Sequence, residues 1–329
     1  MGEQFGFTLS GYKPDKPRSR VQKTISERRK SENTRDQLEP RVGCFFVSCA
    51  NHRRLPAVKA TYYYILSTIA KLFDPLGWVT PVTIKAKIFL QLLWRLKADW
   101  DDEIPEELFD KWRTIYHHLT ELNNLELPRW IGTDATATLS EIHGFADASS
   151  VAYAAVVYLK TVSKSGKITI SLLTAKSKVA PVKPLSIPRL ELSAAVLLSR
   201  LICFVQCSLR VEISRCVCWT DSTIVLAWLK QHPSQWKTFV ANRVSEVQAN
   251  VPAASWPHVP TQDNPVDCAS RGLLGRDLKG FKLWWQGPNW LRCSPDNWPN
   301  NVATAHSDVE MEHKRELCIP LSRSRNGTS

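Results

Sequence analysis

The sequence predicts an α/β fold in which a mixed, five-stranded sheet is flanked by helices and preceded by a helical region. Two observations lead to this expectation. Between residues 139 and 275, short apolar runs of strand length alternate with longer segments whose apolar residues recur at helical spacing. Between residues 61 and 132, the apolar residues recur at helical spacing throughout.

In the helical region, Thr80 is expected to cap a helix that Pro81 opens. A second helix is predicted by apolar residues that repeat every four or three positions and so share one face: Leu108, Trp112, Ile115, Leu119 and Leu122. The acidic stretch 99–103 lies between these helices. It is interpreted as a solvated loop whose charges favour the start of the second helix, and not as a metal site.

The five strands are predicted at Ile142–Phe145, Val151–Leu159, Ile168–Leu172, Cys216–Trp219 and Trp256–Val259. The first three follow one another closely and are expected to pair as an antiparallel meander. Helices are predicted between the later strands, at 188–204, 221–228 and 236–248. Asn264 is expected to cap a final helix that Pro265 opens.

Four acidic residues stand at the ends of these elements. Asp147 and Asp221 each follow an apolar strand, Glu191 lies near the start of a helix, and Asp267 lies in the first turn of another. Converging carboxylates would repel one another unless a cation lay between them. Mg²⁺ prefers carboxylate oxygens, and two such ions can activate a water at a phosphodiester. Each acid alone also has an ordinary structural explanation, such as helix capping.

The order strand-Asp, helix-Glu, strand-Asp, helix-Asp resembles that of the ribonuclease H fold. Several longer motifs narrow the resemblance to the Pol polyprotein of Bel/Pao-type LTR retrotransposons, over about residues 63–298. These motifs are FDPLG at 73–77, IPRLEL at 187–192, WTDS at 219–222, FVANRV at 239–244 and NPVDCASRG at 264–272.

The resemblance implies hydrolysis of the RNA strand of an RNA–DNA hybrid during reverse transcription. Two Mg²⁺ ions, or Mn²⁺ in their place, would be bridged by Asp147 and Asp221, with Glu191 and Asp267 completing their shells. Basic residues close to these acids in sequence are candidates for nucleic-acid binding, with ordinary solvent-facing positions as the alternative: Lys176, Lys178, Lys183 and Arg189.

One departure concerns histidine. Ribonuclease H enzymes often carry a mobile His in the loop before the fourth acid, and residues 259–265 contain none. His258 falls inside the predicted fifth strand and, on the two-residue period of a strand, need not face the site.

The resemblance also implies a domain order. Residues 1–60 hold 13 Lys and Arg against 6 Asp and Glu and are expected to be a basic linker or arm, the remnant that follows a polymerase palm. Residues 41–48 within it could form one strand. Residues 61–132 would be a helical connection region, 139–275 the ribonuclease H-like domain, and 276–329 a Trp- and Pro-rich segment with a disordered tail. The tail aromatics either stack on bases or pin the segment onto the domain.

Composition limits the partners and the compartment. The formal charge of +12 suggests a polyanionic partner, and the resemblance names an RNA–DNA hybrid together with the polymerase and integrase regions of the same polyprotein. Nine cysteines without zinc-site spacing are interpreted as reduced thiols of a cytoplasmic protein, with virus-like particles or the nucleus as alternative locations. No uninterrupted apolar run of about 18 residues indicates a membrane span.

Two other functions were weighed. An aspartic peptidase needs Asp-Thr-Gly or Asp-Ser-Gly so that two aspartates can share one proton. Asp147 and Asp221 are followed by Ala-Ser and Ser-Thr, so peptidase activity is not expected. The remaining alternative is a non-catalytic remnant that keeps the fold and binds nucleic acid or packs against a polymerase.

Overall fold

The computed structural model describes residues 44–46, 60–97, 99–128, 137–299 and 312–313. These all belong to the second of two compact units, which spans Cys44–Ser329. The expectations for a basic arm before residue 44 and for a disordered end of the tail lie outside the described residues.

A four-stranded mixed sheet forms the centre of the described part. Its strands are β3 (Ala137–Ala148), β4 (Ala152–Ser163), β5 (Ile168–Val179) and β6 (Arg215–Thr220). Their order is β5-β4-β3-β6. The first three pair antiparallel in the predicted meander, while β6 runs parallel to β3.

The predicted fifth strand does not form as a regular strand. Residues 255–259 lie beside β6 in parallel but form only isolated bridges, Val217 to Ser255 and Thr220 to His258. Pro257 stands between the two bridged residues and has no backbone N–H to donate to a ladder. The segment therefore occupies the expected place without becoming a regular strand.

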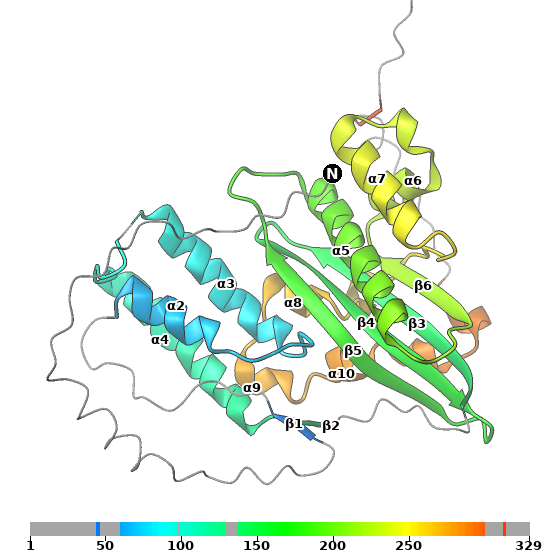
Figure 1. The fold of residues 1–329 in the computed structure, drawn as a ribbon, viewed down its shortest axis with the longest axis horizontal. Helices are drawn as coiled ribbons and strands as arrows, with labels where there is room; N and C mark the ends of the chain where they lie inside the picture. Colours follow the sequence, from blue (N-terminus) through cyan, green and yellow to red (C-terminus); the bar gives the residue numbers. More distant parts are fainter. Residues whose placement is uncertain (1–43, 47–59, 98, 129–136, 300–311, 314–329) are drawn as a thin grey trace, which may run out of the picture. The chain divides into compact units, whose positions relative to one another are not determined.

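One face of the sheet is covered by α5 (Ile187–Ser208), with α6 (Thr223–Lys230) and α7 (Thr238–Asn250) packed in the same apolar cluster (Figure 1). By length and composition alone, α5 is the one described helix that could cross a membrane. This differs from the expectation that no segment is long and apolar enough to do so. In the fold, 61% of its apolar 18-residue window is buried, so packing on the sheet accounts for its composition.

The opposite face packs against the helical region and the C-terminal elements. These are α2 (Tyr62–Ala70), α3 (Thr80–Arg95), α4 (Glu106–Thr120), α8 (Asp267–Arg271), α9 (Gly275–Leu278) and α10 (Lys282–Gln286). The predicted stripe is confirmed: Trp112, Leu119 and Leu122 are buried, and Leu108 and Ile115 pack partly buried against the same core. Helix α3 begins at Thr80, one residue earlier than expected, with Val79 at the N-cap.

Short elements complete the described chain. The apolar run at 41–48 contains β1 (Cys44–Phe46), which pairs antiparallel with β2 (Glu126–Pro128). Five 3₁₀ helices lie at Glu121–Asn124, Pro233–Gln235, Thr261–Asp263, Asn289–Arg292 and Pro295–Asn297.

The Trp-rich segment is pinned onto the domain, one of the two roles considered for it. Trp284 is fully buried, and its Nε1 donates to the carbonyl of Trp78 at 2.8 Å. Tyr158 on β4 donates to the Trp284 carbonyl at 2.6 Å. The segment thereby ties the sheet to the start of α3.

Candidate active site

The sheet brings two of the four acids to one edge. Because β6 runs parallel to β3, and Thr220 pairs with Ala146 in its register, the next residues of the two strands lie at the same end of the sheet, one still paired within β3 and the other just past the end of β6. Those residues are Asp147 and Asp221. Asp147 is almost fully buried, and the hydroxyl of Ser270 on α8 donates to its Oδ2.

The other two acids come from helices. Glu191 lies in the second turn of α5, which follows Pro188, and Ser222 at the N-cap of α6 hydrogen-bonds to it. Asp267 is the first residue of α8, and its Oδ1 accepts from Arg271 Nε at 2.5 Å. Ser149 in the β3–β4 turn donates to the Ser270 carbonyl at 2.8 Å, which holds α8 against this edge.

Burial and neighbouring carboxylates raise the pKa of three of the four acids. The pKa of Asp147 is raised to about 6, mainly by burial; the hydrogen bond from Ser270 opposes this rise, and the charges of Asp221 and Asp267 add to it. Burial raises the pKa of Glu191 to about 7, helped by the charges of Asp221 and Asp147. The pKa of Asp221 is also raised, first by burial and then by Asp267.

A cation fits this environment by the chemistry of the donors. Oδ2 of Asp221 accepts from the Thr261 hydroxyl at 3.0 Å, but its buried Oδ1 has no hydrogen-bond partner among the described residues. An unsatisfied carboxylate oxygen among like charges is unfavourable unless a positive charge compensates it. An all-carboxylate donor set suits Mg²⁺ or Mn²⁺.

A different cluster has the tightest ligand spacing. Within the described part of the chain, three ligand atoms come within 4.8 Å of one another only at the C-terminal end of α4, at His117, His118 and Glu121. Glu121 already accepts from the backbone N–H of Arg276 at 2.8 Å and lies 3.0 Å from Nδ1 of His118. This cluster is therefore satisfied by its own hydrogen bonds.

The sequence interpretation missed three residues at the site. Ser270 could have been found, because it lies one helical turn after Asp267 and so shares its face. The contact of Thr261 with Asp221 could not be predicted from local sequence, because the two residues lie 40 positions apart. His258 does lie against the site: its Nε2 is 3.2 Å from the Asp221 carbonyl oxygen, and its charge lowers the pKa of Asp221.

The four predicted basic residues do not form one cluster: two share a face of β5 and the other two lie elsewhere. Lys176 and Lys178 are exposed on β5, and Lys183 is exposed in the loop that leads to α5. Arg189 is already engaged, because its guanidinium pairs with Glu312 at 2.7 Å and lies 4.9 Å from the ring centroid of Phe239.

The fold and the site define a ribonuclease H-like α/β domain joined to a helical region. Residues 61–222 match the family model described as "Pao retrotransposon-like RNaseH-like domain". These residues therefore form a domain of that type, and the resemblance to Pao-type retrotransposons is confirmed. The matched range contains Asp147, Glu191 and Asp221, whereas Asp267 lies beyond it.

Solved structures show weaker similarity. The N-terminal RNase H domain from Mycobacterium tuberculosis is 14% identical, with 44% of this chain and 96% of that chain covered and a TM-score of 0.28. RNase H1 from Halobacterium salinarum is 15% identical, with 43% and 98% covered and a TM-score of 0.26.

The foamy viral protease-reverse transcriptase, solved with an RNA/DNA hybrid, is 14% identical, with 60% and 27% covered and a TM-score of 0.34. At these scores the solved structures carry no inference about activity. No curated protein matches the chain.

Proposed function

We propose that this chain is the connection and ribonuclease H portion of a Pao-type retrotransposon Pol polyprotein, and that it hydrolyses the RNA strand of RNA–DNA hybrids. One observation carries the proposal: Asp147, Glu191 and Asp221 come from separate elements and have raised pKa values, and a buried oxygen of Asp221 has no hydrogen-bond partner among the described residues. The family match over residues 61–222 supports the same reaction class.

Asp147, Glu191, Asp221 and Asp267 would hold two divalent cations. When bound, the ions would lower the pKa of the attacking water and compensate charge on the departing 3′ oxygen. The chain's own contribution is orientation. Ser270 and Thr261 fix the carboxylates of Asp147 and Asp221 through their hydroxyls, so these groups need little rearrangement when a cation binds.

Recognition of the hybrid would depend on phosphates, groove shape and 2′-hydroxyls more than on base sequence. Lys176, Lys178 and Lys183 are exposed and available for phosphate contacts. Arg189 could take part only by releasing Glu312. The polymerase and integrase regions of the same polyprotein are the proposed protein partners, and the cytoplasm the proposed location.

One observation favours the alternative of a non-catalytic remnant that binds nucleic acid. The carboxylate of Asp267 is already paired with Arg271. That pair must open, or rearrange, before Asp267 can hold a cation.

Cleavage of a labelled RNA–DNA hybrid in Mg²⁺ separates the two functions. Asp221→Asn should abolish cleavage while circular dichroism stays unchanged, because Asn keeps the size of the side chain and loses its charge. If Asp221 served only to accept the hydrogen bond from Thr261, Asn would serve about as well and the rate would not change. Asp277→Asn, which removes an exposed charge at α9, is the matched control and should cut like wild type.

The enzyme proposal fails if the wild-type chain, supplied with its polymerase region, cuts no hybrid. It also fails if Asp221→Asn cuts as fast as wild type. Hybrid binding without cleavage by either protein would establish the remnant instead.

A further inference from the structure

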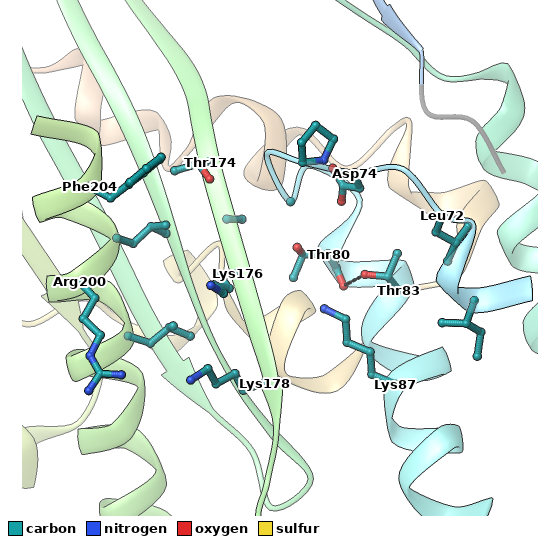
Figure 2. Close-up of a pocket in the computed structure, with 16 residues that line it drawn as sticks. Leu72, Asp74, Thr80, Thr83, Lys87, Thr174, Lys176, Lys178, Arg200 and Phe204 are labelled. Carbon is teal, nitrogen blue, oxygen red and sulfur yellow. Dashed lines mark hydrogen bonds between the residues drawn. The ribbon is translucent and has the colours of Figure 1, made fainter. Parts of the chain in front are cut away.

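A cavity of about 630 Å³ lies between the helical region and the sheet domain (Figure 2). Helix α3 and the turn before it form one wall, β5 forms the floor, and the second half of α5 forms the other wall. Four cations, three hydroxyl groups and one carboxylate line it: Lys87, Lys176, Lys178, Arg200, Thr80, Thr83, Thr174 and Asp74. Figure 2 shows Lys87 reaching from α3 toward the lysines of β5, with Arg200 across from it.

The wall formed by the turn before α3 is held to the β5 floor by direct hydrogen bonds. The carbonyl of Leu76 accepts from the N–H of Ala175 at 2.8 Å and from the hydroxyl of Thr174 at 2.9 Å. Gly77 has a φ of +74°, and a Cβ there would lie 1.8 Å from the Ala175 oxygen. Only glycine allows this contact. The cavity is therefore preformed in the fold.

The lysines in the cavity have no opposite charge bound to them. Lys87, Lys176 and Lys178 form no ion pair with any described residue. The Asp74 carboxylate nearby is used by the backbone N–H groups of Trp78 and Val79, at 2.8 and 3.0 Å. Burial lowers the pKa of Lys87, and the neighbouring charge of Lys176 lowers it further although Asp74 opposes this. An anion bound in the cavity would raise the pKa of Lys87, because its negative charge would oppose both the burial and the repulsion from Lys176.

The helix N-terminus does not supply the binding groups. In the first turn of α3, the N–H groups of Thr80, Val82 and Thr83 donate to nearby carbonyls, and Pro81 has none. An anion would therefore be held by side chains, which suits a flexible, charged polymer better than a single buried phosphate.

The cavity continues across α5. A second cavity of about 190 Å³ shares Lys178, Leu197 and Arg200 with the first and extends across α5 to Arg243 on α7. Its lining also includes Ser193 on α5, Tyr153 on β4 and Glu246 on α7, which pairs with Arg200. Together the two cavities make one open groove that runs from α7 across α5 and β5 to α3.

We propose that this groove binds the phosphate backbone of a nucleic-acid strand, with Lys87, Lys176 and Lys178 contacting phosphates. That this strand belongs to an RNA–DNA hybrid rests on the proposed function. Because Lys87 lies on α3, the groove would make the helical connection region part of the substrate-binding surface. Lysines drawn from α3 and β5, which have no ion pair among the described residues, match an extended polyanion better than a mononucleotide, whereas Arg200 on α5 is paired with Glu246.

The test is the salt dependence of hybrid binding, measured by fluorescence anisotropy in an Asp221→Asn background so that cleavage plays no part. Each lysine that contacts a phosphate contributes about one to the slope of log affinity against log salt. Lys87→Gln should lower the magnitude of that slope by about one, and Lys87→Gln with Lys176→Gln by about two. Lys87→Arg should keep the wild-type slope because the charge remains.

Lys111→Gln is the matched control, since Lys111 is exposed on α4 and lies outside the groove. The groove proposal is overturned if Lys87→Gln and Lys111→Gln bind alike at every salt concentration. It is also overturned if Lys87→Gln weakens the binding of a nucleoside triphosphate but leaves the affinity for the hybrid unchanged. A changed slope in a protein whose wild type never cleaves would refute the enzyme proposal and leave the groove standing.

Discussion

The metal-free protein should lose stability as the pH rises from about 4 to about 7, and Asp147 should account for much of the loss. Burial raises the pKa of Asp147 from 3.8 to about 6. Each unit of pKa difference between the folded and unfolded protein corresponds to about 1.4 kcal/mol, so the ionised Asp147 carboxylate destabilises the fold by about 3 kcal/mol above pH 6.

The sign follows from proton binding. The folded protein holds the Asp147 proton more tightly than the unfolded chain does, so the free energy of unfolding falls as the pH rises through this window. Glu191 acts in the same direction, because burial raises its pKa from 4.5 to about 7. Glu141 acts oppositely and at lower pH: its hydrogen bond with His143 lowers its pKa to about 2, and its contribution is lost only below about pH 4.5.

Asp147→Asn isolates the effect, since Asn can still accept the hydrogen bond from Ser270 but does not ionise. Urea denaturation in EDTA should show the variant gaining about 3 kcal/mol relative to wild type between pH 4 and pH 7.5. Mg²⁺ at pH 7.5 should then stabilise wild type and leave the variant nearly unchanged. A difference between the two proteins that stays constant with pH would refute the reasoning.

Two further predictions concern packing and a buried ion pair. Trp112→Ala should cost about 3–5 kcal/mol, because the ring is fully buried against Phe89. Trp112→Phe should cost less than about 1.5 kcal/mol, since it keeps an aromatic ring and removes a buried N–H that has no partner among the described residues. Equal denaturation midpoints for wild type and the Ala variant would contradict a packed helix. Glu141→Gln should cost about 3–5 kcal/mol, because buried Lys160, 3.1 Å away, loses its counter-charge. The control Glu246→Gln, at the exposed pair with Arg200, should cost less than about 1 kcal/mol, and equal losses would argue against the buried pair.

The sequence was sufficient for the parts of the fold that depend on local pattern. Strand alternation predicted the meander, and the stripe through Trp112 predicted the buried face of α4. The fifth strand was predicted from apolar character alone, and Pro257 limits it to bridges. Motif order located the four acids because each stands at the end of an element.

Contacts between distant segments could not be predicted in this way. Ser270 reaches Asp147 across 123 residues, and Thr261 reaches Asp221 across 40. Lys87 joins the groove only because the turn before α3 docks on β5, a contact that no local pattern encodes.

The central claim is that the four acids form one divalent-cation site. Anomalous diffraction from crystals of the wild type and of the Asp277→Asn control, each soaked in Mn²⁺ without nucleic acid, tests it most directly. The account predicts anomalous density among the carboxylates of Asp147, Glu191, Asp221 and Asp267 in both proteins. Density only at His117, His118 and Glu121, with none among the four acids, would contradict it.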